Sequence, residues 1–277
     1  MSLSILLRSK SSVLGTAICL LFLGAALFAP LLAPRNPYTQ DLGSSLRPPG
    51  HRGYLLGADQ LGRDVLSRIL HGARVSLCIG CLALMFGAFL GIPMGLVSGY
   101  YGGWLDSVMM RMVDVLLSIP RILLAIVIVA TYGVGFWTLV LAVGLPDIAI
   151  FARLARSLSL KLVQLDYVAA AKAMGGRDAR IMFRHVLPGL VGPIAVQLTF
   201  SMAAAILIAG SLSYLGLGIR PPTPEWGSMM AQGRLHMRSA PHLVTYPGLA
   251  LGMSVLGINL LGDGLRQAID PRFVRRN

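Results

Sequence analysis

Three ionisable residues, Asp114, Arg121 and Asp147, stand in or beside long apolar runs of the sequence. Ionisable groups at membrane depth usually face the interior of a helix bundle or an aqueous path. Asp114 and Arg121 are seven residues apart, which places them two turns apart on one face of an expected helix, although Pro120 between them can kink that helix. We therefore predict that these residues line a translocation pathway and meet charged groups of a solute. The alternatives are a structural pair that joins two neighbouring spans, or a helix end at which Asp114 is hydrated.

The sequence lacks the motifs of self-contained catalysis. A chain that hydrolyses ATP needs a phosphate-binding loop of the type G-x-x-x-x-G-K-[ST], and no lysine of this chain follows a glycine. Neither H-E-x-x-H nor G-x-S-x-G occurs, and Glu225 is the only glutamate. The five histidines are dispersed without metal-ligand spacing. We expect no catalytic residue, no metal site and no cofactor bound by the chain, so the protein is predicted not to be an enzyme.

The elements that must position these residues are membrane helices. Of the residues, 55% are hydrophobic and only 13% are charged, which is far from a soluble average. Uncharged stretches exceed the roughly 20 residues that cross a bilayer as a helix, and their solid apolar character does not fit the alternating strands of a barrel. The glycine turn "TYGVG" at 131–135 divides one long stretch in two. We expect six spans, at 12–34, 75–99, 107–130, 136–155, 188–212 and 243–262.

The distribution of cations predicts the orientation. Six spans place the N-terminus, the C-terminus and the connections after spans two and four on one side of the membrane. That side holds 14 of the 24 lysines and arginines, including all three lysines. By the positive-inside rule it is cytoplasmic, although six arginines between Arg35 and Arg74 oppose this assignment. The net charge of +13 is scattered over loops, which suggests anionic lipid headgroups and a protein partner rather than nucleic acid.

The connection between spans four and five has an unusual composition. The segment 152–188 carries seven cations, and its "DYVAAAKAMGG" predicts a short helix that Gly175 and Gly176 end. A second helix, "RDARIMFRHVL", then leads into span five. Alanine gives the first helix little side-chain bulk, so the surface of another protein can approach its backbone. A solvated re-entry loop is the alternative interpretation.

The segment "AAAKAMGGRDARIMFRHVLP" resembles the EAA loop of permeases of ATP-binding-cassette (ABC) importers. Ala170, Ala171, Gly175, Leu187 and Pro188 match its pattern, whereas Ala169 replaces the usual glutamate. In that family the loop inserts into a cleft of a cytoplasmic ATPase, which supplies the missing phosphate-binding loop. The residues expected by this resemblance to couple to an ATPase are Asp166, Ala170, Ala171, Lys172, Gly175, Arg177, Arg184, Leu187 and Pro188.

Three further stretches resemble the dipeptide, oligopeptide and nickel permeases, specifically their C-type second subunit. They are "LLGADQLGRDVLSRILHGARVSL" at 55–77, "SYLGLGIRPPTPEWGSMMAQGR" at 213–234 and "NLLGDGLRQAIDPR" at 259–272. The resemblance implies an all-α membrane bundle with the MetI-like ABC permease fold. It also implies a heterodimer with a B-type permease, two ATPase subunits that bind ATP and Mg, and an extracytoplasmic solute-binding protein.

Two segments are candidates for contact with that binding protein. The segment 35–74 is rich in Gly, Pro and Arg, and "LGRDVLSRIL" within it predicts a helix after a turn. Loops of this length are usually functional or disordered, so we favour a docking surface, with a plain solvated loop as the alternative. "RPPTPEWG" combines three prolines with Trp226, which predicts either a rigid segment with an interfacial anchor or packing between spans. The candidate contact residues are Asp59, Arg63, Asp64 and Trp226.

The sequence thus predicts one permease domain over 1–277. It comprises a tail and first span at 1–34, an extracytoplasmic loop at 35–74, a core bundle at 75–262 with the coupling loop at 152–188, and a cytoplasmic tail at 263–277. The expected location is the bacterial cytoplasmic membrane, with both termini in the cytoplasm. The expected function is uptake of di- and oligopeptides. Nickel or a metal chelate, glutathione and opine-like compounds are alternative substrates, and a self-sufficient secondary transporter is the alternative class, although no internal repeat supports it.

Overall fold

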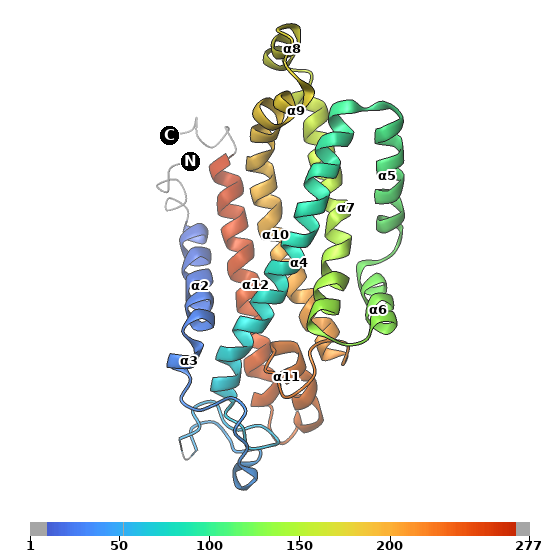
Figure 1. Cartoon of the computed structure of the whole chain (residues 1–277). Helices are drawn as coiled ribbons and strands as arrows, with labels where there is room; N and C mark the ends of the chain where they lie inside the picture. Colours follow the sequence, from blue (N-terminus) through green and yellow to red (C-terminus); the bar gives the residue numbers. More distant parts are fainter. Residues whose placement is uncertain (1–9, 52, 270–277) are drawn as a thin grey trace.

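The computed structural model describes residues 10–51 and 53–269, and helices dominate this part of the chain. Figure 1 shows long helices that run side by side between two ends of the bundle, one carrying α8 and the other carrying α11. The helices are α2 (Lys10–Leu27), α3 (Ala29–Leu32), α4 (Val65–Tyr101), α5 (Gly103–Ser118), α6 (Arg121–Tyr132), α7 (Phe136–Leu162), α8 (Asp166–Ala173), α9 (Asp178–Ile181), α10 (Leu187–Tyr214), α11 (Trp226–Gly233) and α12 (His242–Ile269), with 3₁₀ turns at Leu42–Ser44 and Arg234–His236 and a π-helical turn at Met182–Val186.

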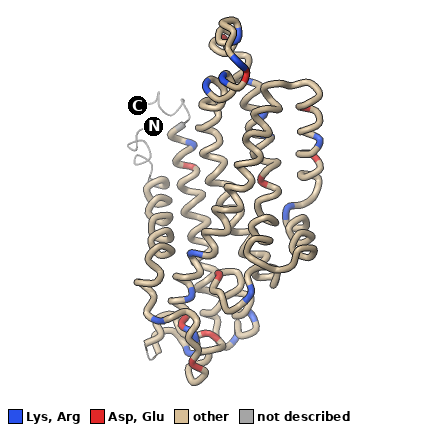
Figure 2. Tube along the Cα trace, in the orientation of Figure 1, with Lys and Arg blue, Asp and Glu red and all other residues tan. Residues whose placement is uncertain are grey.

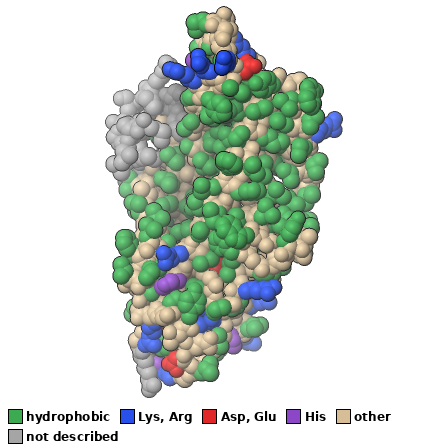
Figure 3. Space-filling view, in the orientation of Figure 1, with side chains coloured by type: hydrophobic (Ala, Val, Ile, Leu, Met, Phe, Trp, Pro, Cys, Tyr) green, Lys and Arg blue, Asp and Glu red, His purple; other side chains and the backbone are tan. Residues whose placement is uncertain are grey.

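The helices confirm an all-α membrane bundle. Within the described residues, four helices are long and apolar enough to cross a bilayer. They are α4, α7, the continuous run from α9 through α10, and α12. The pair α5 and α6 passes the same test only when joined, and α2 is a shorter apolar helix. Charged residues are sparse along the middle of the bundle (Figure 2), and apolar side chains cover the middle of the face shown in Figure 3.

The span expected over 107–130 consists of two helices rather than one. The structure breaks it between α5 and α6, whose axes differ in direction by 88°. Ile119 ends α5 in an extended conformation and Pro120 follows it. A residue before proline is disfavoured in the helical region because of the proline ring, which explains the break at this position.

Two other boundaries differ from the sequence prediction. Span two begins at Val65 rather than 75, because the helix predicted at "LGRDVLSRIL" continues into it as α4. The Asp64 side chain caps this helix by accepting a hydrogen bond from the Ser67 backbone N–H at 2.7 Å. Helix α7 continues to Leu162 rather than 155, so the segment that connects it to the next span is shorter than expected. The first residues of α2 and the last residues of α12 both lie toward the α8 end of the bundle (Figure 1).

The closest packing joins α4 and α7 along a row of glycines. A Cβ atom built on Gly91 would lie 2.8 Å from Cβ of Phe151, and one built on Gly99 would lie 2.7 Å from Cβ of Ser159. The same clash arises for Gly87 and Gly95, so the four glycines, four residues apart, meet α7 in one regular register. Small residues let membrane helices approach closely and gain van der Waals contact. These glycines therefore set the distance between the two central helices.

The N-terminal helix α2 packs antiparallel against α12, and glycines again allow the two backbones to approach closely. A Cβ on Gly257 would lie 2.9 Å from Cβ of Ile18, and one on Gly15 would lie 2.7 Å from Cβ of Leu260. Close contact of these helices holds the first span on the outside of the bundle.

We expect Gly91→Ala and Gly252→Ala to change stability in opposite directions. Gly91 has no room for a methyl group, so its replacement should destabilise the protein by about 1–3 kcal/mol. A Cβ on Gly252, inside α12, meets nothing within 4 Å, so alanine there should stabilise the helix by about 0.5–1 kcal/mol. Thermal unfolding of the purified chain in one detergent measures both. Equal effects of the two variants would contradict the packing described here.

Candidate functional site

Helix α8 projects beyond the end of the helix bundle (Figure 1). It begins at Asp166 after Val163, Gln164 and Leu165, and ends at Ala173 as predicted. Gly175 follows with a φ of +77°, a conformation that L side chains rarely adopt, and its N–H donates to the Lys172 carbonyl at 2.9 Å. The glycine thus turns the chain sharply back toward α9.

One face of α8 is anchored and the other is free. Val168 and Ala171 are buried in an apolar cluster with Tyr100, Ile181 and Val186. The opposite face presents the small side chains of Ala169, Ala170 and Ala173. At its tip Met174 is 82% exposed. Helix α8 is therefore packed against the bundle on one face, carries only small side chains on the other, and ends in an exposed apolar residue. These properties suit a helix that inserts into a groove of another protein.

Hydrogen bonds tie this segment to the bundle. The Tyr100 hydroxyl, in the last turn of α4, donates to Asp178 at 2.7 Å, and Lys172 Nζ lies 4.7 Å from the centre of the Tyr100 ring. The Tyr167 hydroxyl donates to the carbonyl oxygen of His185 at 3.1 Å. The position of α8 is therefore set by α4 and by the π-helical turn that leads into α10.

The structure places the predicted coupling residues in one region, mostly exposed. Ala171 is buried and Leu187 is partly buried, whereas the remaining seven are exposed, namely Asp166, Ala170, Lys172, Gly175, Arg177, Arg184 and Pro188. Figure 3 shows basic side chains gathered just below the projecting helix. Sequence reasoning missed Met174 and Tyr100. The position of Met174 directly before the glycine pair was a usable signal for an exposed tip, but nothing in the sequence pairs Tyr100 with Asp178.

The three pathway candidates are arranged differently from the prediction. Asp114 lies on α5 and Arg121 begins α6, so the break in the span removes the common helix face expected for them. Asp114 pairs with Arg153 of α7 at 2.7 Å, with both side chains more than half exposed. Arg121 pairs instead with Asp147 of α7, whose side chain is fully buried.

Together with a third pair these contacts tie α5 and α6 to α7. Arg156 Nη2 of α7 donates to Asp106 Oδ2 of α5 at 2.6 Å, and Ser98 of α4 donates to the same carboxylate. The contacts are those of the structural alternative, in which ion pairs join neighbouring spans. A role in the pathway stays a prediction for Asp114, Arg121 and Asp147.

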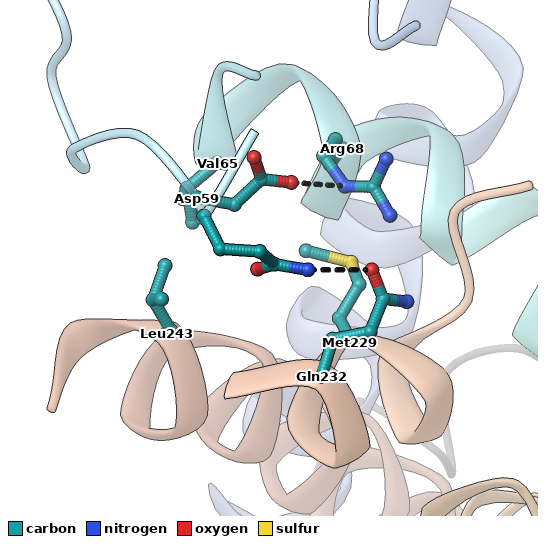
Figure 4. A pocket seen from close by; sticks show the side chains of 7 residues that line it. Asp59, Val65, Arg68, Met229, Gln232 and Leu243 are labelled. Carbon is teal, nitrogen blue, oxygen red and sulfur yellow. Dashed lines mark hydrogen bonds and ion pairs between the residues drawn. The ribbon is translucent and has the colours of Figure 1, made fainter. Parts of the chain in front are cut away.

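A network of buried charges organises the opposite end of the bundle. Asp59 accepts from Arg63 Nε at 2.6 Å and lies 3.5 Å from Arg68 Nε of α4. Arg63 Nη2 donates to Gln232 of α11 at 2.9 Å. Figure 4 shows Asp59 of the loop, Arg68 of α4 and Gln232 of α11 meeting at this point. Asp59, Arg68 and Gln232 help to line a cavity of about 10 Å³, which is no more than a single water molecule needs.

The four residues predicted to contact the binding protein are all buried at this end of the bundle. Asp59, Arg63 and Asp64 are 6%, 1% and 2% exposed, and Trp226 is fully buried. Trp226 donates from Nε1 to the Ile69 carbonyl at 3.0 Å and meets the Phe22 ring edge to face at 5.6 Å. Of the two interpretations of "RPPTPEWG", packing between helices is the one observed. The docking role of the four side chains stays untested, and in this conformation they shape the loop from within.

Two carboxyl groups at this end have shifted pKa values. Burial raises the pKa of Glu225, although its carboxylate caps α11 by accepting from the N–H groups of Gly227 and Ser228 at 2.9 and 2.8 Å. The hydrogen bond from the Ser44 hydroxyl lowers the pKa of the exposed Asp41 carboxyl. Within the described residues, no group of three or more His, Cys, Asp or Glu side chains could hold a metal ion.

We expect the Arg121–Asp147 pair to behave as a buried structural pair. Arg121→Leu leaves the Asp147 carboxylate buried without a counter charge, which should destabilise the protein by about 3–5 kcal/mol. The double variant Arg121→Leu/Asp147→Leu should recover most of that loss. Breaking the exposed pair with Arg153→Gln should cost at most about 1 kcal/mol.

Thermal unfolding of the four proteins measures these differences, and uptake by the reconstituted importer measures transport. A double variant with normal stability but no transport would instead support a role of the pair in the pathway. If Arg121→Leu alone left stability unchanged, the structural role would be excluded.

The chain matches two protein families. Residues 91–275 match the family described as "Binding-protein-dependent transport system inner membrane component", and residues 2–49 match the "N-terminal TM domain of oligopeptide transport permease C". Among curated relatives, the glutathione transport system permease protein GsiD of Pectobacterium atrosepticum is 44% identical over 267 residues, covering 96% of this chain and 89% of the relative. The di/tripeptide transport system permease protein DppC of Pseudomonas aeruginosa is 42% identical over 271 residues, covering 96% of this chain and 89% of that one.

A solved structure confirms the fold. The chain superimposes on a chain of "Inward facing conformations of the MetNI methionine ABC transporter: CY5 SeMet soak crystal form" with a TM-score of 0.60 and 17% identity, over 73% of this chain and 96% of that one. The projecting α8, the two family matches and the relatives agree with the resemblance found in the sequence. The chain therefore belongs to the binding-protein-dependent transport system inner membrane components, as a C-type permease of the peptide ABC importers, and it is not itself an enzyme.

Proposed function

We propose that the chain pairs with a B-type permease to form the path by which an importer takes up short peptides. Two ATPase subunits, which bind ATP and Mg, dock at the α8 end, and a solute-binding protein delivers the substrate at the α11 end. The α8 end then faces the cytoplasm, together with both termini. The excess of lysine and arginine in the connection between α7 and α10 supports this orientation.

The observation that carries the proposal is the form of α8. It is held to the bundle by Val168 and Ala171, it offers alanines on its outer side, and it ends in the exposed Met174. For an ATPase to move the bundle, the contact must be rigid on the permease and must fit a groove on the ATPase. The chain has no phosphate-binding loop of its own, so the energy must enter through such a contact.

The names of the relatives support short peptides as the substrate class. The relatives cited transport glutathione and di- or tripeptides, and glutathione is itself a tripeptide. These substrates share charged termini and a peptide backbone, which favours one path for both. Nickel, metal chelates and opine-like compounds remain the alternatives within the same importer type.

We expect Met174→Asp to abolish docking of the ATPase subunits. Met174 and Leu235 are both 82% exposed but lie at opposite ends of the bundle, so Leu235→Asp is the matched control. Affinity purification of the tagged permease should recover at least about tenfold less ATPase with Met174→Asp, since losing one central apolar anchor costs about 2 kcal/mol or more. The Leu235→Asp variant should recover the normal amount.

Normal ATPase recovery with Met174→Asp would contradict the docking surface. Uphill uptake by proteoliposomes that contain the permease chain alone would contradict the importer assignment and favour a secondary transporter. The substrate class is tested separately, by identifying the ligand of the cognate binding protein and by competing its uptake with dipeptides, glutathione and nickel.

A further inference from the structure

A crevice opens among four helices on the outside of the bundle. Its volume is about 650 Å³, within the range of about 300–1,000 Å³ that is typical of small-molecule sites. Its wall is formed by α2, α4, α10 and α12, and almost every side chain in it is apolar. The lining includes Phe22 and Leu23 of α2, Leu77 and Cys78 of α4, Met202 of α10 and Ile258 of α12.

The hydroxyl groups in the wall are already satisfied. Thr199 Oγ1 donates to the Val196 carbonyl at 2.7 Å, and Ser254 Oγ donates to the Leu251 carbonyl at 2.8 Å. Arg74 of α4 is the one charged side chain among the lining residues. The crevice therefore offers an apolar wall and a single cationic group.

Arg74 has no counter charge within the described part of the chain. It is exposed, and no hydrogen bond, ion pair or ring contact involves its guanidinium. The neighbouring Arg68, less than two turns earlier on α4, is instead buried and lies 3.5 Å from Asp59. An unpaired arginine at the mouth of an apolar crevice favours an anionic ligand, because the guanidinium binds phosphate through two parallel N–H bonds.

The depth of Arg74 fits the level of lipid headgroups. It is the last charged residue before the uncharged run from Val75 to Leu105, so it marks the point where α4 enters the hydrocarbon. From Arg74 the crevice follows α4 to Leu84, a distance of about 15 Å at 1.5 Å per residue. That is about half of a hydrocarbon core roughly 30 Å thick, which is the depth of one leaflet.

We propose that this crevice binds a phospholipid of the leaflet at the α11 end of the bundle. One acyl chain lies between α2 and α4, and the phosphate pairs with Arg74. The lipid fills the space between the outer helix α2 and the rest of the bundle, so it acts as a structural ligand. This site does not depend on the identity of the transported solute.

Tryptophan fluorescence can test the proposal in the full chain. Trp226 is buried, and its ring touches Phe22, which lines the crevice. Trp104 and Trp137 are 76% and 71% exposed, so replacing both by Phe leaves Trp226 as the only reporter. In detergent, phosphatidylglycerol with brominated acyl chains should quench Trp226 in a saturable way, and unlabelled phosphatidylglycerol or phosphatidylethanolamine should reverse the quenching.

Variants of this single-tryptophan chain separate the phosphate contact from the apolar one. Arg74→Gln should weaken phosphatidylglycerol binding roughly tenfold, the loss typical of a charge-assisted pair. Arg111→Gln is the matched control, because Arg111 is also an exposed arginine of an apolar helix but lies on α5, away from the crevice. Cys78→Phe should fill the crevice and abolish quenching by any lipid.

Diacylglycerol lacks the phosphate and a free fatty acid carries a carboxylate, so both should bind more weakly than phosphatidylglycerol. Equal binding of diacylglycerol, or binding unchanged by Arg74→Gln, would overturn the proposal. Native mass spectrometry of the assembled importer provides the second test. The parent complex should retain a phospholipid that the Arg74→Gln complex loses, whereas a parent complex without lipid would contradict the proposal.

Discussion

The close approach of α4 and α7 is the constraint on which the rest of the bundle depends. Four glycines of α4, spaced one turn apart, bring its backbone against α7 so tightly that a methyl group has no room. Lipid tails are as apolar as leucine, so burial of apolar area does little to join helices in a bilayer. Close van der Waals contact along this row supplies the association instead, and the other helices are added around the central pair.

The ion pairs follow from this arrangement. Because α7 is fixed against α4, its charged residues can reach the broken pair α5 and α6 at three levels, through Arg156, Arg153 and Asp147. Each pair places an acid and a base from different helices together, which neutralises charges that a hydrocarbon environment would reject. The break at Pro120 lets α6 turn across α7 rather than continue along it.

Much of the fold could be predicted from the sequence, because long uncharged runs and the glycine pair after α8 have direct physical meanings. The turn at 131–135, the short helix α8 and its continuation into α10 followed from local signals. The partners of Asp114 and Arg121 did not follow, since spacing along one helix assumed that the span is straight. Pro120 marked a possible kink, but an 88° turn depends on packing against α7 that no local pattern encodes.

The predicted binding-protein contacts show that burial of charged residues is also hard to predict from sequence. Asp59, Arg63 and Asp64 have the residue types of a contact surface, yet their charges are used inside the loop, where Arg63 also reaches Gln232 from more than 160 positions away. Polar type alone does not separate an exposed charge from one that is paired in the interior. Burial of both members of such a pair is a tertiary property.

Helix α4 has a further mechanical consequence. Its first turns are held at one end by the contact of Arg68 with Asp59, and its last turn is held at the other by the bond from Tyr100 to Asp178. It is a single helix of 37 residues, about 55 Å long at 1.5 Å per residue. One continuous helix thus connects the α8 end of the bundle to the α11 end, and a tilt imposed at either end is transmitted to the other without passing through a loop.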